Sequence, residues 1–315
     1  MGKRRIRLLS ERNDVSIIGV DTQVLRREEV KVKFGIECYS SLEEACRENN
    51  IDAAVISTSP LSHAAIIKEC LEHNLHVFTE INLISTSYED NMQLAEEKGK
   101  VLFLSSTFLY QEDTLKIIER INNVNSPVNY IYHVGQYLPD WHPWESYNDY
   151  FIGNPKTNGC REIMAIELPW IYTAFGKVTD FKVMKSKNTS LDISYNDNYL
   201  IMLEHESGAK GVFCVDVVSR YPVRNLEVIG EDIHLFWKGT VDSLAEYDVE
   251  KKCVETIDLG VCSENLADYA AFIDENPYRK ELESYIDQIN DPGILPVWDF
   301  SRDKIVLDLI DRIEA

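Results

Sequence analysis

Short apolar runs rich in β-branched residues alternate with helical patterns along the first 125 residues, and this alternation strongly limits the possible folds. The apolar runs lie at residues 15–21, 51–57, 76–79 and 101–105, and the helical patterns lie at 3–11, 41–50, 61–74 and 88–98. Apolar strands separated by helices of this length pair in parallel, with helices on both faces of the sheet. Because such crossovers are right-handed, the pattern predicts a doubly wound, Rossmann-like α/β domain over residues 1–124.

The pattern changes after about residue 125, where strands follow one another through short turns. Seven strands are expected, at residues 130–136, 180–187, 198–205, 210–218, 225–230, 233–238 and 253–257. A long helix is expected at 159–175, and two more at 278–289 and 301–314. This order predicts a second, α+β domain over residues 125–315 with a mostly antiparallel sheet, whose last helices are free to pack back on the first domain.

The charge balance excludes several classes of partner. The chain has 32 Lys+Arg against 53 Asp+Glu, a formal net charge of -21, so neither nucleic acid nor an anionic membrane is an expected partner. No apolar run is long enough to span a membrane, and the basic start lacks the apolar core of a signal peptide. Seven scattered cysteines without a Cys-x-x-Cys pair, and histidines without ligand spacing, indicate a cytoplasmic protein with free thiols and no metal.

Polar residues follow two of the predicted parallel strands, at the edge where ligands bind in a doubly wound sheet. Asp21 ends the first apolar run, where a carboxylate can accept hydrogen bonds from an adenine ribose and repel a 2′-phosphate; an ordinary turn aspartate is an equally good interpretation. After the second run, small residues and a proline would let the backbone approach a cofactor, and a histidine opens the next helix. These residues are Ser57, Thr58, Ser59, Pro60 and His63.

Several segments together resemble the Gfo/Idh/MocA family, the relatives of glucose–fructose oxidoreductase and inositol dehydrogenase. They are residues 52–63, 76–83 and 95–104, the helix entered near Gly159, and residues 278–286. The resemblance implies an N-terminal NAD(P)-binding domain and a C-terminal sheet domain that builds the substrate site. It also implies hydride transfer at a sugar or polyol carbon and a homodimer or homotetramer formed through the second domain. NAD is favoured over NADP by Asp21.

The start of the chain departs from the family pattern. The family opens with a strand and a Gly-x-Gly-x-x-Gly turn that binds the cofactor pyrophosphate. Here Gly2 takes the place of the last of those glycines and the helix at 3–11 follows at once. The first strand, central in the family's sheet, therefore has no counterpart, which predicts either a gap or a rearranged middle in the sheet. Either the start lies upstream, or this cradle for phosphate has been lost.

Two catalytic motifs of the family are also altered. Its Glu-Lys-Pro motif reads Glu80-Ile81-Asn82, so Glu80 and Asn82 remain candidates to line the cofactor while the lysine that would stabilise an alkoxide is absent. In its Asp-x-x-x-His motif, Glu162 takes the aspartate position and Ile166 the histidine position.

A replacement acid–base set is therefore considered on the same helix. Arg161 could hold an anionic group while Glu162 or Glu167 takes the proton. Ion pairing on the helix surface is the alternative interpretation for each of the three.

Aromatic and polar residues are interleaved at residues 135–147, a composition that suits a carbohydrate site. Gln136, Trp141 and Trp144 are candidates to bind a sugar, and His142 is the candidate replacement base. The segment resembles one found in family members from bacterial surface-polysaccharide and sialic-acid-like sugar pathways; a proline-pinned structural loop is the alternative. Tyr110 lies where the family lines the nicotinamide pocket.

Two functions are thus predicted as alternatives. The first is an NAD(P)-linked oxidoreductase that acts on a sugar or a sugar nucleotide. The second is a non-catalytic family member, a binding or scaffold protein that has kept the fold but lost cofactor binding and the catalytic Lys and His.

Overall fold

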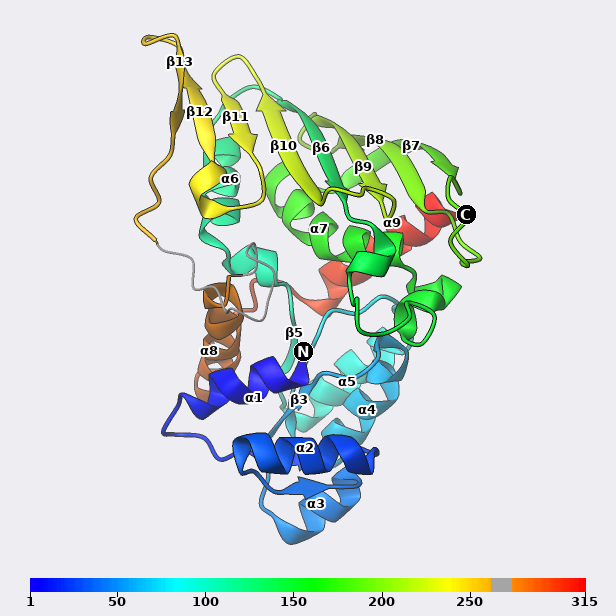
Figure 1. Ribbon diagram of the computed structural model, residues 1–315. Helices are drawn as coiled ribbons and strands as arrows, with labels where there is room; N and C mark the ends of the chain where they lie inside the picture. Colours follow the sequence, from blue (N-terminus) through cyan, green and yellow to red (C-terminus); the bar gives the residue numbers. More distant parts are fainter. Residues whose placement is uncertain (262–273) are drawn as a thin grey trace. The chain divides into compact units, whose positions relative to one another are not determined.

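The computed structural model describes residues 1–261 and 274–315, which divide into two compact units (Figure 1). Unit 1 comprises Met1–Ser105 and Tyr278–Ser301, and unit 2 comprises Ser106–Pro277 and Arg302–Ala315. The division thus lies at residue 105, whereas the sequence pattern places it at 124. The two last helices are shared out: most of α8 (Asn276–Asn290) belongs to unit 1 and most of α9 (Phe300–Glu314) to unit 2.

The helices and strands of unit 1 alternate as the sequence predicts. The helices are α1 (Gly2–Ser10), α2 (Val24–Phe34), α3 (Leu42–Glu48), α4 (Pro60–Glu72) and α5 (Tyr88–Lys98). The strands are β1 (Gly19–Val20), β2 (Cys38–Tyr39), β3 (Ala53–Ile56), β4 (His76–Thr79) and β5 (Leu102–Leu104). Local signals set several boundaries: the Ser41 hydroxyl accepts a hydrogen bond from the Glu44 amide at the start of α3, and Gly99 ends α5 in the left-handed region.

The strands of unit 1 form two separate parallel sheets. β1 pairs with β2, and β3, β4 and β5 pair in that order, each strand parallel to its neighbour. Within the described residues β1 and β3 are not paired, so of the two expected arrangements, a gap or a rearranged middle, the structure shows a gap between the sheets. The Rossmann-like organisation is otherwise as predicted.

An aromatic cluster forms the centre of unit 1. The rings of Phe78 and Phe103 stack with centroids 5.1 Å apart, and the ring of Tyr285 meets both edge-on. Because Phe78 and Phe103 belong to neighbouring strands and Tyr285 to α8, this cluster attaches α8 to the β3–β5 sheet.

Unit 2 is built on one large sheet. Its strands are β6 (Asn129–Gly135), β7 (Val178–Ser186), β8 (Asn198–His205), β9 (Lys210–Asp216), β10 (Val223–Ile229), β11 (His234–Trp237), β12 (Ala245–Asp248) and β13 (Cys253–Thr256). Their order across the sheet is β13-β12-β11-β10-β6-β9-β8-β7. Among the described strands only β6 and β9 pair in parallel; every other neighbouring pair is antiparallel, as predicted.

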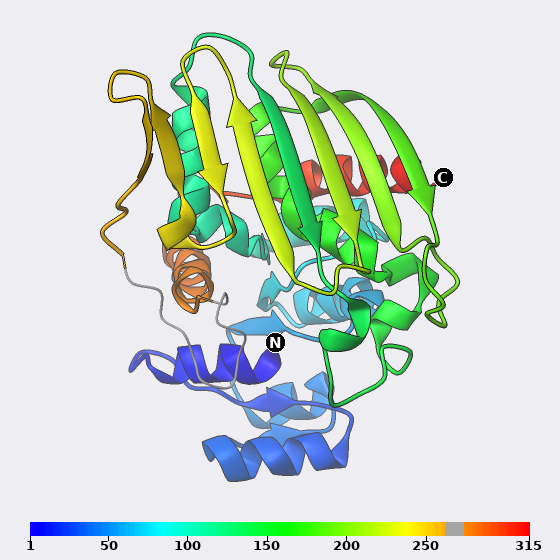
Figure 2. The same ribbon diagram turned by 45° about the horizontal axis from the view of Figure 1, so that its top comes forward.

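One face of this sheet is covered by helices. Figure 2 shows α6 (Glu112–Asn122), α7 (Gly159–Phe175) and α9 on the same side of the strands. Along β8, residues alternate between buried and exposed, as expected when one face is covered. Short 3₁₀ helices complete the unit: η1 (Thr107–Tyr110), η2 (Leu138–Asp140), η3 (Phe151–Gly153), η4 (Pro155–Thr157) and η5 (Val241–Ser243).

The core of unit 2 lies between α7 and the sheet. The ring of Tyr132 lies 5.3 Å from that of Trp170, 6.3 Å from that of Trp237 and 5.6 Å from that of Phe213. In neither unit do the described residues include a helix with the length and apolar character that crossing a bilayer requires.

Candidate functional site

The residues that follow β1 and β3 are the most accessible of the predicted cofactor set. Asp21 is partly exposed; one carboxylate oxygen accepts a hydrogen bond from the Gln23 amide at 2.8 Å, and the other lies 3.8 Å from the Arg26 guanidinium. Thr58 and Ser59 are exposed at the end of β3, whereas Pro60 is buried in the first turn of α4.

The start of α1 lies beside the turn after β3. A Cβ placed on Gly2 would lie 3.7 Å from the Cβ of Ser57, so the structure brings these two predicted residues together. The Ser57 hydroxyl donates a hydrogen bond to Glu80 at 3.3 Å, which connects the same turn to the end of β4.

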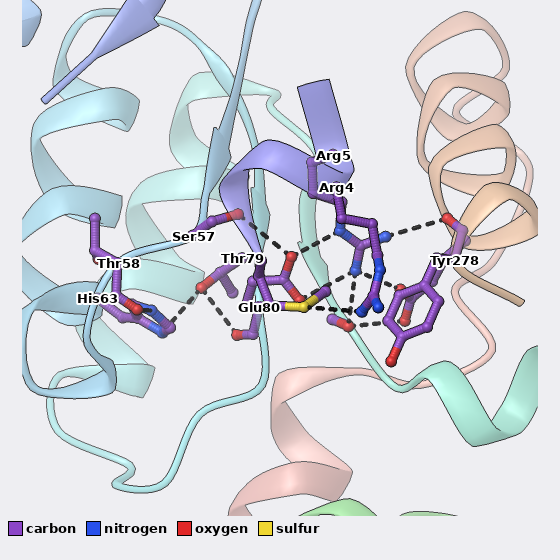
Figure 3. Close-up of polar contacts among 11 residues, drawn as sticks. Arg4, Arg5, Ser57, Thr58, His63, Thr79, Glu80 and Tyr278 are labelled. Atoms are coloured by element: carbon purple, nitrogen blue, oxygen red, sulfur yellow. Dashed lines mark hydrogen bonds and ion pairs between the residues drawn. The ribbon is translucent and has the colours of Figure 1, made fainter. Parts of the chain in front are cut away.

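Glu80 is held by an arginine that sequence analysis did not single out (Figure 3). Arg5 of α1 is 2% exposed, and its Nε and Nη2 atoms lie 2.7 Å and 3.1 Å from the two carboxylate oxygens of Glu80. This is the fork-to-fork geometry in which a guanidinium binds a carboxylate most specifically. Glu80 is therefore engaged within unit 1.

A second carboxylate shares the same guanidinium. Nη2 of Arg5 lies 2.7 Å from Glu281 of α8, whose other oxygen accepts a hydrogen bond from the Ser105 hydroxyl at 2.9 Å. Nη1 donates to the carbonyl of Tyr278 at 3.1 Å, and the guanidinium lies 4.6 Å from the centre of the Phe78 ring. Burial raises the pKa of Glu281, and the charge of Arg5 offsets part of that effect.

His63 and Asn82 form a separate buried pair beneath the same edge. Nδ1 of His63 lies 2.7 Å from the Asn82 side-chain oxygen, and Nε2 lies 3.1 Å from the carbonyl of Thr58. Burial lowers the pKa of His63, so the ring is neutral at pH 7 and carries a single proton. Both residues are at most 2% exposed and contact each other rather than solvent.

In unit 2 the predicted aromatic segment forms a stacked cluster around His142. Its ring stacks on Trp144 and on Tyr150, with centroids 5.1 Å and 4.6 Å away, and its Nδ1 lies 2.8 Å from the carboxylate of Glu145. Trp144 is 76% exposed, so one of its ring faces is free for a ligand. Sequence analysis missed Tyr150, which lies only three positions after the aromatic segment at residues 135–147.

Glu162 in the first turn of α7 is electrostatically coupled to this cluster. Burial alone raises the pKa of Glu162 to about 7, because no charged or hydrogen-bonding partner among the described residues compensates the lost hydration. The charges of Glu162 and Glu145 both add to the effect of burial in raising the pKa of Tyr150. The Tyr150 hydroxyl has no hydrogen-bond partner within the described part of the chain. A titrating carboxyl thus lies near an uncommitted hydroxyl.

The other two charged candidates of α7 have internal partners. Arg161 is buried and forms ion pairs with Asp311 and Glu314 of α9.

Glu167 is fully buried; its carboxylate accepts hydrogen bonds from Tyr132 at 2.7 Å and Trp170 at 2.8 Å and pairs with Arg224 at 2.7 Å. These contacts join α7 to α9 and to the sheet, a structural role that leaves neither group open to a substrate.

Two of the remaining predicted residues pack within the protein. Trp141 is partly buried and donates through its indole nitrogen to the carbonyl of Gln136 at 3.1 Å, which supports the loop itself. Tyr110 is buried at the end of η1.

Comparison with known proteins finds a matching family model and similar solved structures. Residues 1–106 match the model of an oxidoreductase family with an NAD-binding Rossmann fold, Gfo/Idh/MocA. No curated protein matches the chain.

Solved structures of other proteins are similar to almost the whole chain. An oxidoreductase from Agrobacterium radiobacter in complex with NAD+, L-tartaric acid and magnesium is 13% identical, with a TM-score of 0.81 over 98% of this chain and 91% of that one. Biliverdin reductase from Synechocystis is 17% identical, with a TM-score of 0.77 over 99% and 94%. UDP-N-acetylglucosamine 3-dehydrogenase from Acidithiobacillus ferrooxidans is 14% identical, with a TM-score of 0.73 over 100% and 93%.

At these identities the structural matches show the fold alone, but they agree with the family model of the N-terminal region. The family is therefore matched by the first 106 residues, and beyond them the comparisons show a shared fold.

Proposed function

We propose that the chain is an NAD(P)-dependent oxidoreductase that acts on a sugar or a sugar nucleotide. The observation that carries the proposal is Glu162, whose pKa is raised to about 7 beside the stacked rings of unit 2. A general acid or base works best when its pKa is close to the working pH.

The accessible residues of unit 1 fit part of a dinucleotide. Asp21 would accept hydrogen bonds from a ribose, which favours NAD, and the exposed turn at Thr58 and Ser59 would face the phosphates. His63, Glu80 and Asn82 are buried with partners of their own and would support this edge rather than contact the cofactor. When bound, the nicotinamide would supply the hydride acceptor for an alcohol or the donor for a ketone.

The residues of unit 2 would then handle the substrate and its proton. In the oxidation direction, the Glu162 carboxylate accepts the proton of a sugar hydroxyl as that carbon loses a hydride and becomes a carbonyl. The Tyr150 hydroxyl is available to hydrogen-bond the reacting oxygen, and the face of Trp144 can stack on the C–H surface of the ring. The sugar-nucleotide dehydrogenase among the structural neighbours supports this substrate class.

His142 remains an alternative base in this proposal. Its pairing with Glu145 leaves Nε2 available, and its ring is held between Trp144 and Tyr150. Substitution distinguishes the two candidates, because only loss of the residue that acts as the base should remove the pH dependence of turnover.

A non-catalytic binding function is the second candidate, and one observation favours it. Glu80 of the altered Glu-Lys-Pro motif is bound by Arg5, and Ile81 stands where the family has its catalytic lysine. A unit organised around this ion pair can keep its fold without any redox chemistry.

Cofactor titration followed by turnover separates the two functions. We expect NADH fluorescence to change on binding, and a panel of sugars and UDP-sugars to reduce NAD+ with a rate that rises as pH increases through about 7. Glu162→Gln should lower kcat by about 10²-fold or more and remove that pH dependence, whereas the exposed Glu250→Gln should change neither. No response to NADH or NADPH would leave the binding function as the better account.

We also propose that the uncovered face of the unit 2 sheet pairs with a second copy of the chain. Met202, Val212 and Ile131 lie side by side across β8, β9 and β6, and all three are at least 41% exposed. Adjacent exposed apolar side chains on a flat sheet indicate an interface. Sedimentation velocity should show a dimer or tetramer that Met202→Lys dissociates; a monomeric wild-type chain at all concentrations would contradict the pairing.

A further inference from the structure

A histidine, a thiol and a carboxylate meet on the β6–β9 pair, next to Ile131 and Val212 on the same strands. In the parallel register His133 lies opposite Cys214, and Gly135 opposite Asp216. One ligand atom from each of His133, Cys214 and Asp216 lies within 4.8 Å of those of the other two. His133 and Cys214 are partly exposed on the face that the helices leave uncovered, while Asp216 is buried.

The carboxylate of Asp216 is held in place from several sides. Its Oδ1 accepts hydrogen bonds from the amides of Val218 at 2.9 Å and Ser219 at 2.7 Å. Its Oδ2 accepts from the Ser219 hydroxyl at 3.0 Å and lies 2.7 Å from Nε2 of His133. These contacts hold the carboxylate so that Oδ2 lies next to the imidazole nitrogen, and the two atoms are thus already positioned as neighbouring ligands.

Gly135 makes this arrangement possible. A Cβ at this position would lie between 2.5 Å and 2.7 Å from three atoms of the Asp216 carboxylate, so any other residue would push the carboxylate away. The carboxylate therefore occupies the place of the missing side chain and reaches across the strand pair toward His133. The close approach at Gly135 involves only the Asp216 carboxylate.

We propose that His133, Cys214 and Asp216 bind a zinc ion, with a fourth position left for water or an external ligand. A nitrogen, a thiolate and a carboxylate oxygen suit zinc, whereas calcium and magnesium prefer oxygen ligands alone. Bonds of about 2.0–2.3 Å in tetrahedral geometry place neighbouring ligand atoms about 3.3–3.6 Å apart. The separation of Nε2 from Oδ2 would widen from 2.7 Å to about 3.3 Å, which small side-chain rotations allow.

Zinc binding at this site releases protons. The neutral imidazole and the thiolate bind the ion, so the proton between His133 and Asp216 and the proton of the Cys214 thiol are released to solvent. No oxidant or reductant is needed, because zinc does not change its oxidation state.

Metal titration of the full chain tests the site. We expect isothermal titration with ZnCl₂ to give one ion per chain, and Co²⁺ to give a thiolate-to-cobalt charge-transfer band. Cys214→Ser should abolish that band and His133→Gln should weaken zinc binding, while the exposed Cys253→Ser should leave both signals unchanged. Ser219→Ala, which touches only the carboxylate, should weaken binding by about 10-fold.

Two further results would decide against the site. Zinc binding that survives Cys214→Ser in a variant with a wild-type circular dichroism spectrum would place the ion elsewhere. Because the cluster lies on the face proposed to pair, the titration is repeated with Met202→Lys; no binding by either protein would overturn the proposal, whereas binding by the variant alone would show that pairing covers the site. Neither result depends on cofactor binding or turnover.

Discussion

A glutamate in the first turn of a helix is ordinarily favoured as an anion, because the amide groups there carry partial positive charge. Glu162 occupies such a place, yet burial raises its pKa to about 7. Desolvation therefore outweighs the helix dipole at this residue. The resemblance to the family's motif could suggest Glu162 as a candidate, but a sequence could not show that the pKa of Glu162 is shifted.

The raised pKa of Glu162 makes the stability of the protein depend on pH. The folded-state pKa of about 7 lies above the ordinary value of 4.5, so between these values the native protein binds more protons than the unfolded chain. The stability contributed by neutral Glu162 is complete below pH 4.5 and is lost as pH rises through 7. We expect Glu162→Gln, relative to wild type, to gain about 2–3 kcal/mol between pH 5 and pH 8.

Urea unfolding of both proteins at the two pH values measures this effect. Glu250→Gln, at an exposed turn of the same unit, is the matched control and should follow wild type at both. Equal pH dependence in wild type and Glu162→Gln would show that Glu162 is already ionised at pH 7.

Other residue-level outcomes depend on partners that a sequence does not reveal. Glu80 was expected to line a cofactor, but the structure pairs it with Arg5, 75 positions away. Glu281, which completes the cluster, is separated from Arg5 by 276 positions. Chain pattern identifies the kinds of residue at a site, whereas the pairing of buried charges is decided by how distant elements pack.

At the scale of elements, the sequence predicted the helices and strands whose apolar residues are buried in the structure. The expected bounds agree with the structure at residues 76–79, 88–98, 159–175 and 198–205. Helix α2 was not predicted, and none of its residues is buried, so it carries no apolar face to recognise. The expected strand at 15–21 is reduced to Gly19–Val20, which among the described strands pairs with β2 alone.

Strand β9 shows how closely an element is fitted to its neighbour. Gly211 lies opposite Tyr130 of β6, and a Cβ on Gly211 would lie 1.9 Å from the ring. That ring stacks on Phe175 of α7 at 4.2 Å, and its hydroxyl lies 2.9 Å from Nε2 of His205. The aromatic ring therefore covers the glycine and connects two strands to the long helix.

We expect Gly211→Ala to destabilise the protein by about 1–3 kcal/mol, because the added methyl group has no space under the Tyr130 ring. Urea unfolding gives the free energy. If the ring is the cause, Tyr130→Leu should reduce the cost of Gly211→Ala, and the double-mutant cycle should show coupling. Additive effects of the two substitutions would assign the loss to the strand backbone instead.

At the scale of the whole molecule, the alternation of strands and helices was enough to predict the two fold classes, but not how the chain is shared between the units. Residues 278–301 return to the first unit, while residues 302–315 belong to the second. The parallel pairing of β6 with β9 likewise brings His133 beside Cys214 and Asp216, which are more than 80 positions away. No spacing rule for metal ligands applies across such a connection.

Each unit has its own aromatic core, so a local defect should affect one unit before the other. Arg5→Met is such a defect, because it leaves the Glu80 and Glu281 carboxylates buried without their cation. We expect a loss of about 3–5 kcal/mol at pH 8 and a smaller loss at pH 5, where protonation of Glu281, whose pKa burial raises, removes part of the uncompensated charge. Hydrogen exchange should accelerate in residues 1–105 and 278–301, while residues 106–261 keep wild-type protection.

Arg12→Met, which breaks only the exposed pair with Asp14, should change stability by less than about 1 kcal/mol. Uniform acceleration over both units would mean that they unfold as one body and that the Arg5 cluster stabilises the whole chain.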